Sequence, residues 1–189
     1  MKRKASGGSA TGGTGDIKPQ FMTMSGAVAA AVDDYRVDVF QIPVVRPRGK
    51  NESATIMEML SLDWYLSVEN IGDAAFTEAA FLTQNTARTS GDTATVGSLA
   101  QDIADPRTLG MVMLNQTLTT SGSMSTIYPI HVDLTDSNGN GILWANDTIT
   151  LVSAAVANAT AGASTCKLKY RWVNVGLVEY LGIVQQQSS

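Results

Sequence analysis

Cysteine, histidine and charged side chains are all scarce in this chain of 189 residues. It has one cysteine, Cys166, and one histidine, His131, and charged residues make up only 16% of the chain. A single cysteine excludes a disulfide within the chain, and its place in an alternating apolar row predicts a buried structural thiol. No cysteine and histidine cluster has zinc-site spacing, and no glycine-rich phosphate loop lies between a predicted strand and a helix.

Long apolar runs are also missing. No segment approaches the roughly 18 apolar residues that a membrane span requires. The basic start, Met1 to Lys4, continues into glycine, serine and threonine instead of the apolar segment of a signal peptide. We therefore expect a soluble protein that is not conventionally secreted and has no membrane partner.

Residues 1–20 differ in composition from the rest of the chain. Residues 5–15 contain only glycine, serine, threonine and alanine, which predicts a disordered arm ahead of a single domain over residues 21–189. Four cations and one acid give the arm a net charge of +3. Since the whole chain has a net charge of -4, the other residues have a net charge of -7. The arm and the domain therefore need not bind the same partner.

The pattern in the domain is that of an all-β protein with polar, uncharged surfaces. One short helix is predicted at residues 96–103, after the cap candidates Thr93 and Thr95 and before Asp105-Pro106. Strands are predicted at residues 35–42, 54–68, 75–83, 109–118, 126–134, 142–156 and 166–184. About eight strands without alternating helices indicate an antiparallel sandwich or barrel.

The closing stretch, Cys166 to Val184, is the longest apolar and extended segment, and we expect the rest of the chain to be organised around it. Its first half places Cys166, Leu168, Tyr170 and Trp172 on one side of a strand and Lys167, Lys169 and Arg171 on the other. From Val173 onward both sides are apolar, which predicts a central strand or one buried against another subunit, with Gly176 and Gly182 at a bulge or a close backbone approach. The residues expected at this subunit interface are Val178, Tyr180 and Val184.

The stretch at residues 54–68 favours either a helix or a strand. Period two fits it better and predicts a strand with Leu60, Leu62, Trp64 and Leu66 facing the core.

Basic residues form three groups that phosphate could contact. They are the arm triplet (Lys2, Arg3, Lys4), a loop (Arg46, Arg48, Lys50) and the strand face (Lys167, Lys169, Arg171). We predict nucleic-acid contacts for the triplet and the strand face. The alternative for each group is a solvated surface, since no aromatic residue is interleaved with the basic residues in the way that a base-stacking surface requires.

A short loop has the spacing of a calcium site. Asp136, Asn138 and Asn140 alternate, Gly141 takes the sixth place and Asp147 the twelfth. The flanks are strand-like rather than helical, so the alternative is a hairpin turn in which the Asn-Gly pairs supply positive φ angles.

An enzyme is a further alternative. His131 and Asp133 lie two apart on one predicted strand face, which suits a catalytic pair, but no nucleophile elbow or oxyanion motif accompanies them. A surface or interface histidine is the simpler interpretation.

Two segments together resemble a known family. HVDLTDSNGNGILWANDTITL (residues 131–151) and KYRWVNVGLVEYLGIVQ (residues 169–185) look like the C-terminal half of the single jelly-roll capsid proteins of small circular single-stranded DNA viruses, and VDVFQIPVV (residues 37–45) agrees in layout. The resemblance implies an eight-stranded jelly roll that assembles with copies of itself into an icosahedral shell around a single-stranded DNA genome. It implies a location in the virion, and in the host cell, including its nucleus, during assembly.

One feature departs from this family, because its members often have a strongly Arg/Lys-rich terminus and this chain has only a basic triplet. A jelly-roll carbohydrate-binding or attachment module is the rival interpretation. It predicts exposed aromatic residues in a loop or on a sheet face, whereas Trp64 and Trp172 have core parity.

Overall fold

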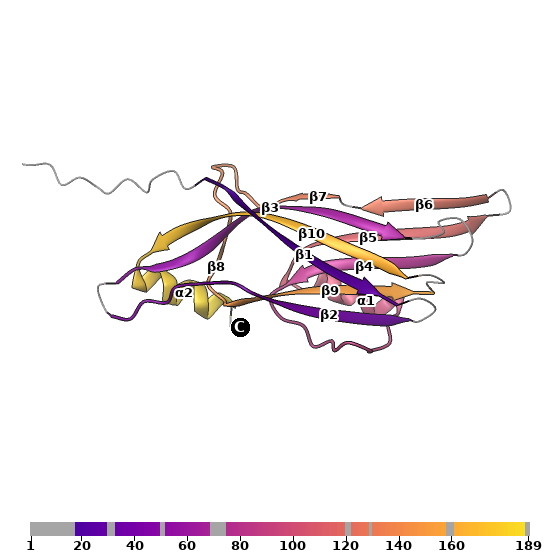
Figure 1. Ribbon diagram of the computed structural model, residues 1–189, viewed down its shortest axis with the longest axis horizontal. Coiled ribbons are helices and arrows are strands. Elements are labelled where there is room, and N and C mark those ends of the chain that lie inside the picture. Colours follow the sequence, from indigo (N-terminus) through magenta and orange to yellow (C-terminus); the bar gives the residue numbers. More distant parts are fainter. Residues whose placement is uncertain are drawn as a thin grey trace, which may run out of the picture.

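The computed structural model describes residues 18–29, 33–49, 52–68, 75–119, 122–128, 130–157 and 161–187. The predicted arm lies outside these ranges except for Lys18 to Gln20. The described residues form ten strands and two helices in an elongated sandwich (Figure 1). Within these ranges no helix is both long enough and apolar enough to cross a bilayer.

Two antiparallel sheets make up the sandwich. Sheet A has the order β1 (Gln20–Val28), β10 (Gly162–Val175), β3 (Ala54–Val68) and β7 (His131–Asp133), with β8 (Ile142–Trp144) also paired to β3. Sheet B has the order β2 (Asp34–Gln41), β9 (Thr148–Val156), β4 (Phe76–Thr83), β5 (Thr108–Thr119) and β6 (Gly122–Tyr128). We call the face that each sheet turns toward the other its inner face.

The strand pairs are nested along the chain. β1 pairs with β10, β2 with β9, β3 with β7 and β8, and β4 with β5. A ribbon of strands that folds back on itself and then rolls into two sheets has this order, which is the jelly roll. The predicted all-β jelly-roll sandwich is therefore confirmed.

The main core lies between the inner faces. Cys166 and Leu168 of β10 are fully buried there with Trp64 of β3, and Tyr170 is 9% exposed, so the predicted apolar side of β10 is confirmed. Burial raises the pKa of the Cys166 thiol to about 12, as expected for a structural cysteine. The other members of this core include Met24, Ile42, Leu62, Leu82, Val112, Trp144, Ile149 and Leu151.

A bulge in β3 changes which of its side chains face the core. The register with β10 shifts between Lys169, which pairs with Ser61, and Tyr170, which pairs with Met59. Leu60 is thereby left over, and the strand before it reverses its faces. Leu62, Trp64 and Leu66 point inward as predicted, but Met57 and Met59 replace Leu60 in the core. The prediction for Leu60 was wrong because a strict period of two contains no bulge.

Helix α1 (Val96–Ala104) confirms the predicted helix. Thr95 caps it, since its side chain accepts a hydrogen bond from the Ser98 backbone while the Ser98 hydroxyl accepts one from the Thr95 backbone. The helix lies on the outer face of sheet B, where Leu99 is buried against Phe81 and Val152.

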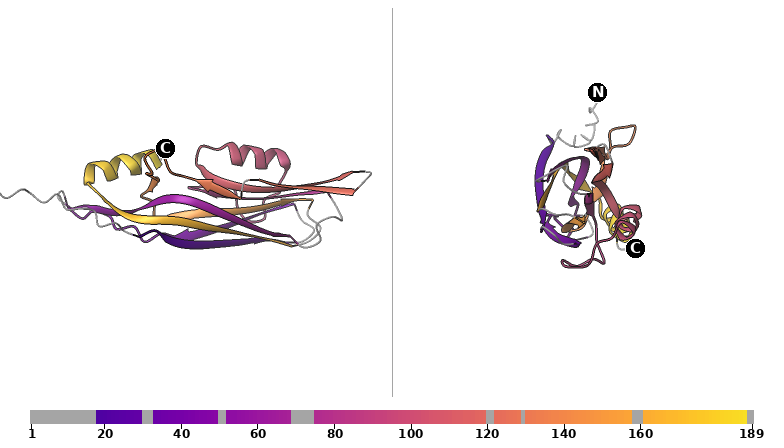
Figure 2. Two further views of the ribbon diagram at one scale, coloured as in Figure 1. Left: turned by 90° about the horizontal axis from the view of Figure 1, so that it is seen from above. Right: turned by 90° about the vertical axis from the view of Figure 1, so that its right-hand side faces the viewer.

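The second half of the predicted closing strand is a helix. β10 ends at Val175, and α2 (Leu177–Gln187) begins after Gly176, whose carbonyl accepts the Tyr180 N–H at 2.9 Å. Gly182 lies inside this helix rather than at a strand bulge. The helix packs through Tyr180, Ile183 and Val184 on the ends of β3 and β10, and Figure 2 shows it on the same side of the sandwich as α1.

Three other boundaries differ from the prediction. β1 was not predicted, although it alternates exposed and buried residues and Gln20 already pairs with Tyr170. The strand predicted at 126–134 is divided into β6 in sheet B and β7 in sheet A, and the one at 142–156 into β8 in sheet A and β9 in sheet B. Both divided segments leave one sheet and enter the other, which a continuous apolar pattern does not reveal.

Candidate functional site

Lys167, Lys169 and Arg171 share the outer face of sheet A, as their alternation in sequence predicts. Arg171, however, is engaged by Glu58 of β3. Its Nε and Nη2 donate to the two Glu58 carboxylate oxygens at 2.6 and 2.9 Å, and Glu58 is only 4% exposed. Burial alone would raise the pKa of Glu58, but the Arg171 guanidinium and the Gly141 N–H together lower it. Arg171 therefore ties β10 to β3.

Lys167 and Lys169 make no ion pair with the residues that the structure describes. The Lys167 ammonium lies 4.5 Å from the centre of the Phe21 ring on β1, and Phe21 pairs with Lys169 in the sheet. Phe21 is 55% exposed. The sequence offered no sign of this contact, because Phe21 is nearly 150 residues from its partners and β1 was not predicted.

The residues predicted at a subunit interface have three different environments on α2. Tyr180 is buried in the chain's own core, Val184 is half-buried beside it, and Val178 is 86% exposed. Leu181, three residues after Val178, is 55% exposed and was not in the prediction. Helical periodicity brings Val178 and Leu181 together on one exposed side of α2.

The loop predicted to bind calcium is a closely hydrogen-bonded turn. The Asp136 carboxylate accepts the backbone N–H of Asn138 at 2.8 Å and that of Asn140 at 2.9 Å, and Gly139 has a φ of 79°. Asp147 pairs instead with Arg46, at 2.6 Å. The turn accounts for this sequence without a metal, and calcium binding at Asp136, Asn138, Asn140 and Asp147 stays a prediction.

A chelator tests that prediction directly. If the loop holds calcium, removing the ion with EGTA should lower Tm, and Asp136→Ala should abolish the difference between samples with and without calcium. An unchanged Tm in both conditions would leave the turn as the whole role of this loop.

His131 and Asp133, the two residues of the enzyme alternative, each hydrogen-bond to another residue rather than to each other. His131 Nδ1 lies 2.7 Å from the Asp63 carboxylate of the neighbouring strand. Asp133 accepts the Thr135 backbone N–H at 2.9 Å and its hydroxyl at 2.7 Å, and these bonds lower the pKa of Asp133. The arrangement is that of a polar strand surface, and among the described residues the hydrogen-bond partner of His131 is the Asp63 carboxylate rather than a nucleophile.

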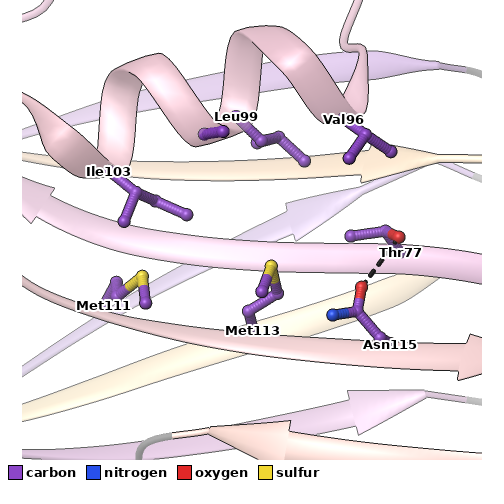
Figure 3. A pocket seen from close by; sticks show the side chains of 8 residues that line it. Thr77, Val96, Leu99, Ile103, Met111, Met113 and Asn115 are labelled. Atoms are coloured by element: carbon purple, nitrogen blue, oxygen red, sulfur yellow. Dashed lines mark hydrogen bonds between the residues drawn. The ribbon is translucent and has the colours of Figure 1, made fainter.

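An apolar groove runs between α1 and β5 on the outer face of sheet B (Figure 3). Its volume is about 280 Å³. Its walls are Val96, Leu99, Ala100 and Ile103 of the helix and Thr77, Met111, Met113 and Asn115 of the sheet. At one end the Thr77 hydroxyl donates to the Asn115 side chain at 2.9 Å. The groove can accept an apolar group, but it holds no charged or catalytic side chain.

An acid is buried inside the sandwich. Glu78 of β4 is 1% exposed, and neither of its carboxylate oxygens has a hydrogen-bond partner among the described residues. It faces Gly162 of β10, where a methyl group would collide with Glu78 Oε2. Burial raises the pKa of Glu78 to about 7. The sequence offers no signal for the burial of Glu78, since an acid in a predicted strand is ordinarily expected on the solvent-facing side.

Neither the protein family models nor the curated protein sequences contain a match to this chain. Among solved structures it is similar to VP1 of New Jersey polyomavirus, with 9% identity over 84% of this chain and 100% of that chain and a TM-score of 0.42. A Merkel cell polyomavirus virus-like particle gives 10% identity over 93% of this chain and 80% of that chain, with a TM-score of 0.45. VP1 of trichodysplasia spinulosa-associated polyomavirus, in complex with GM1 oligosaccharide, gives 8% identity over 86% of this chain and 95% of that chain, with a TM-score of 0.44. These values are too low for the likeness to bear on function.

Proposed function

We propose that this chain is a viral capsid protein that assembles with copies of itself into a closed shell around a nucleic-acid genome. The observation that carries the proposal is the exposed apolar side of α2, formed by Val178 and Leu181 at one end of the jelly roll. Exposed apolar groups grouped on one element favour burial by a partner, and a second copy of the chain is the partner that a shell supplies. The resemblance of residues 131–151 and 169–185 to single jelly-roll capsid proteins supports the same function.

Placing two negative charges on the exposed apolar side of α2 tests this proposal. Val178→Asp combined with Leu181→Asp should leave the domain folded, because Tyr180 and Ile183 on the other side of the helix still pack on the sheets. Assembly should be lost, since two carboxylates would have to be desolvated in the contact. Size-exclusion chromatography with light scattering should show large particles for the natural chain and single chains for the variant.

Val96→Asp is the matched control, because it also replaces an exposed apolar residue of a helix by a carboxylate, but on α1, where Val96 is 62% exposed. It should assemble like the natural chain. A double variant that assembles as well as this control would contradict the role given to α2.

The arm should matter for packaging rather than for folding. Deleting residues 1–17 removes Lys2, Arg3 and Lys4 but no residue of the sandwich. In a shell the charge of many arms is summed on one genome, although a single arm binds weakly. The truncated protein should assemble into particles with a lower ratio of absorbance at 260 nm to that at 280 nm. An unchanged ratio would show that the arm does not contact nucleic acid.

A carbohydrate-binding module remains the second candidate. It is favoured by one observation, namely that Phe21 and Tyr65, 55% and 57% exposed, lie on the outer face of sheet A. A carbohydrate-binding module is expected to have exposed aromatic side chains of this kind on a sheet face.

A further inference from the structure

We propose that the outer face of sheet A binds single-stranded nucleic acid by stacking unpaired bases on Phe21 and Tyr65, with Lys167 and Lys169 between them on β10. The inference rests on the proposed packaging function and adds to it the surface used, the strandedness of the ligand and the mode of binding.

The two aromatic side chains lie on one face of the sheet. Phe21 of β1 pairs with Lys169 of β10, which pairs with Ser61 of β3, and Tyr65 lies four residues further along β3. With strand spacings of about 4.8 Å and a rise of about 3.4 Å per residue, the two rings are roughly 17 Å apart. A strand of several nucleotides can therefore reach both rings.

Most of the described Lys and Arg side chains that have no ion pair lie close to Phe21 in the fold. Arg36, Arg46, Arg88, Arg107 and Arg171 each pair with an acid. Of the described cations, Lys18, Arg48, Lys167 and Lys169 have no such pair. Two of these four, Lys167 and Lys169, belong to β10, and a third, Lys18, precedes its partner β1 by two residues. The sequence also connects Lys2, Arg3 and Lys4 to the same strand.

The side chains between the rings suit a sugar-phosphate chain. The Ser25 and Thr165 hydroxyls are within 3.0 Å of each other, and Thr165 pairs with Tyr65. The face also carries two acids: Asp63, which pairs with Lys167 in the sheet and lies 2.7 Å from His131 Nδ1, and Asp133 of β7, which pairs with Ser61.

Helix α1 lies on sheet B (Figure 2), and α2 packs on Val173 and Val175 at the far end of β10. Phe21 and Tyr65 stay more than half exposed, so neither helix covers the two rings.

The combination of aromatic rings with lysines favours nucleic acid over a neutral sugar. A sugar can stack on either ring but gains nothing from Lys167 or Lys169, whereas a phosphate chain gains from both. Stacking also selects single strands, because the bases of a duplex do not offer their faces to a flat sheet.

The experiment measures fluorescence anisotropy of a labelled 20-nucleotide oligo-dT with the full chain at several salt concentrations. Phe21→Ala and Tyr65→Ala should each weaken binding by about 5- to 150-fold, with an unchanged slope of log affinity against log salt. Lys167→Gln with Lys169→Gln should instead reduce that slope by about 1.4 in magnitude. Val39→Ala is the control, because Val39 is also 57% exposed but belongs to sheet B, and it should bind like the natural chain.

Several results would overturn the inference. They are an affinity that neither aromatic substitution changes, equal affinity for a 20-base-pair duplex, and tight binding of a neutral glucan that Phe21→Ala abolishes. Light scattering on the same samples separates this inference from the shell. Aromatic variants that assemble normally but bind oligo-dT weakly would support the inference. Particles that form normally and whose affinity for oligo-dT is unchanged by either aromatic substitution would refute the inference but not the shell. A chain that binds oligo-dT through both rings but never assembles would refute the shell but not the inference.

Discussion

Replacing Arg171 by methionine should lower the free energy of unfolding by about 3–5 kcal/mol, the effect expected when one partner of a buried ion pair is removed. Glu58 would keep its charge in a site that is only 4% exposed. It would retain the Gly141 N–H at 2.7 Å but lose both guanidinium bonds, which are the main interactions that lower its pKa against burial. Urea denaturation at pH 7 measures the change.

Two further variants give this experiment its controls. Arg46→Met breaks the Arg46–Asp147 pair, in which both side chains are more than half exposed, and should cost no more than about 1 kcal/mol. Glu58→Leu combined with Arg171→Met should recover much of the lost stability, because no charge is left buried. A loss for Arg171→Met no larger than for Arg46→Met would show that Glu58 reaches solvent.

Raising the pH from 5 to 8.5 should destabilise the protein through Glu78. In the unfolded chain this carboxyl titrates at its ordinary pKa of 4.5, whereas in the sandwich its pKa is about 7. The folded state therefore holds a proton that the unfolded state has released. The stability that this difference provides is fully present below about pH 4.5 and is lost as the pH rises through about 7. A shift of this size corresponds to about 3 kcal/mol.

Glu78→Gln separates this carboxyl from all other titrating groups. The amide has nearly the same shape and no charge, so the variant should lose most of the fall in Tm between pH 5 and 8.5. Glu179→Gln on the exposed side of α2 is the matched control and should keep it. A Glu78→Gln variant whose Tm falls as steeply as that of the control would contradict the burial of a neutral acid at this position.

The sequence predicts those parts of the fold in which local pattern and tertiary environment agree. Cys166 to Trp172 alternates without interruption, so both faces of β10 could be predicted, and α1 has a cap and a stop signal. After Val173 the same segment has apolar residues at a spacing of two, interrupted by Glu179, and also at spacings of three and four. Leu177, Tyr180 and Val184 have the helical spacing, which was the signal for α2.

Other features depend on contacts between distant residues and have no local signal. The bulge at Leu60 exists because β3 must match β10 on both sides of it, and it places Glu58 opposite Arg171. The contact of Lys167 with Phe21 requires the first and last strands of the jelly roll to pair. Sequence alternation could therefore place three cations on one face, but it could not tell that Arg171 is engaged by an acid while the two lysines border an aromatic ring.

Negative-stain electron microscopy of the purified full-length protein tests the central claim most directly. The chain should form closed, uniform particles at high protein concentration, and particles made with single-stranded DNA should protect it from nuclease. A single chain that stays monomeric at high concentration, across salt concentrations and from pH 5 to 8.5, would contradict the assignment as a shell-forming protein.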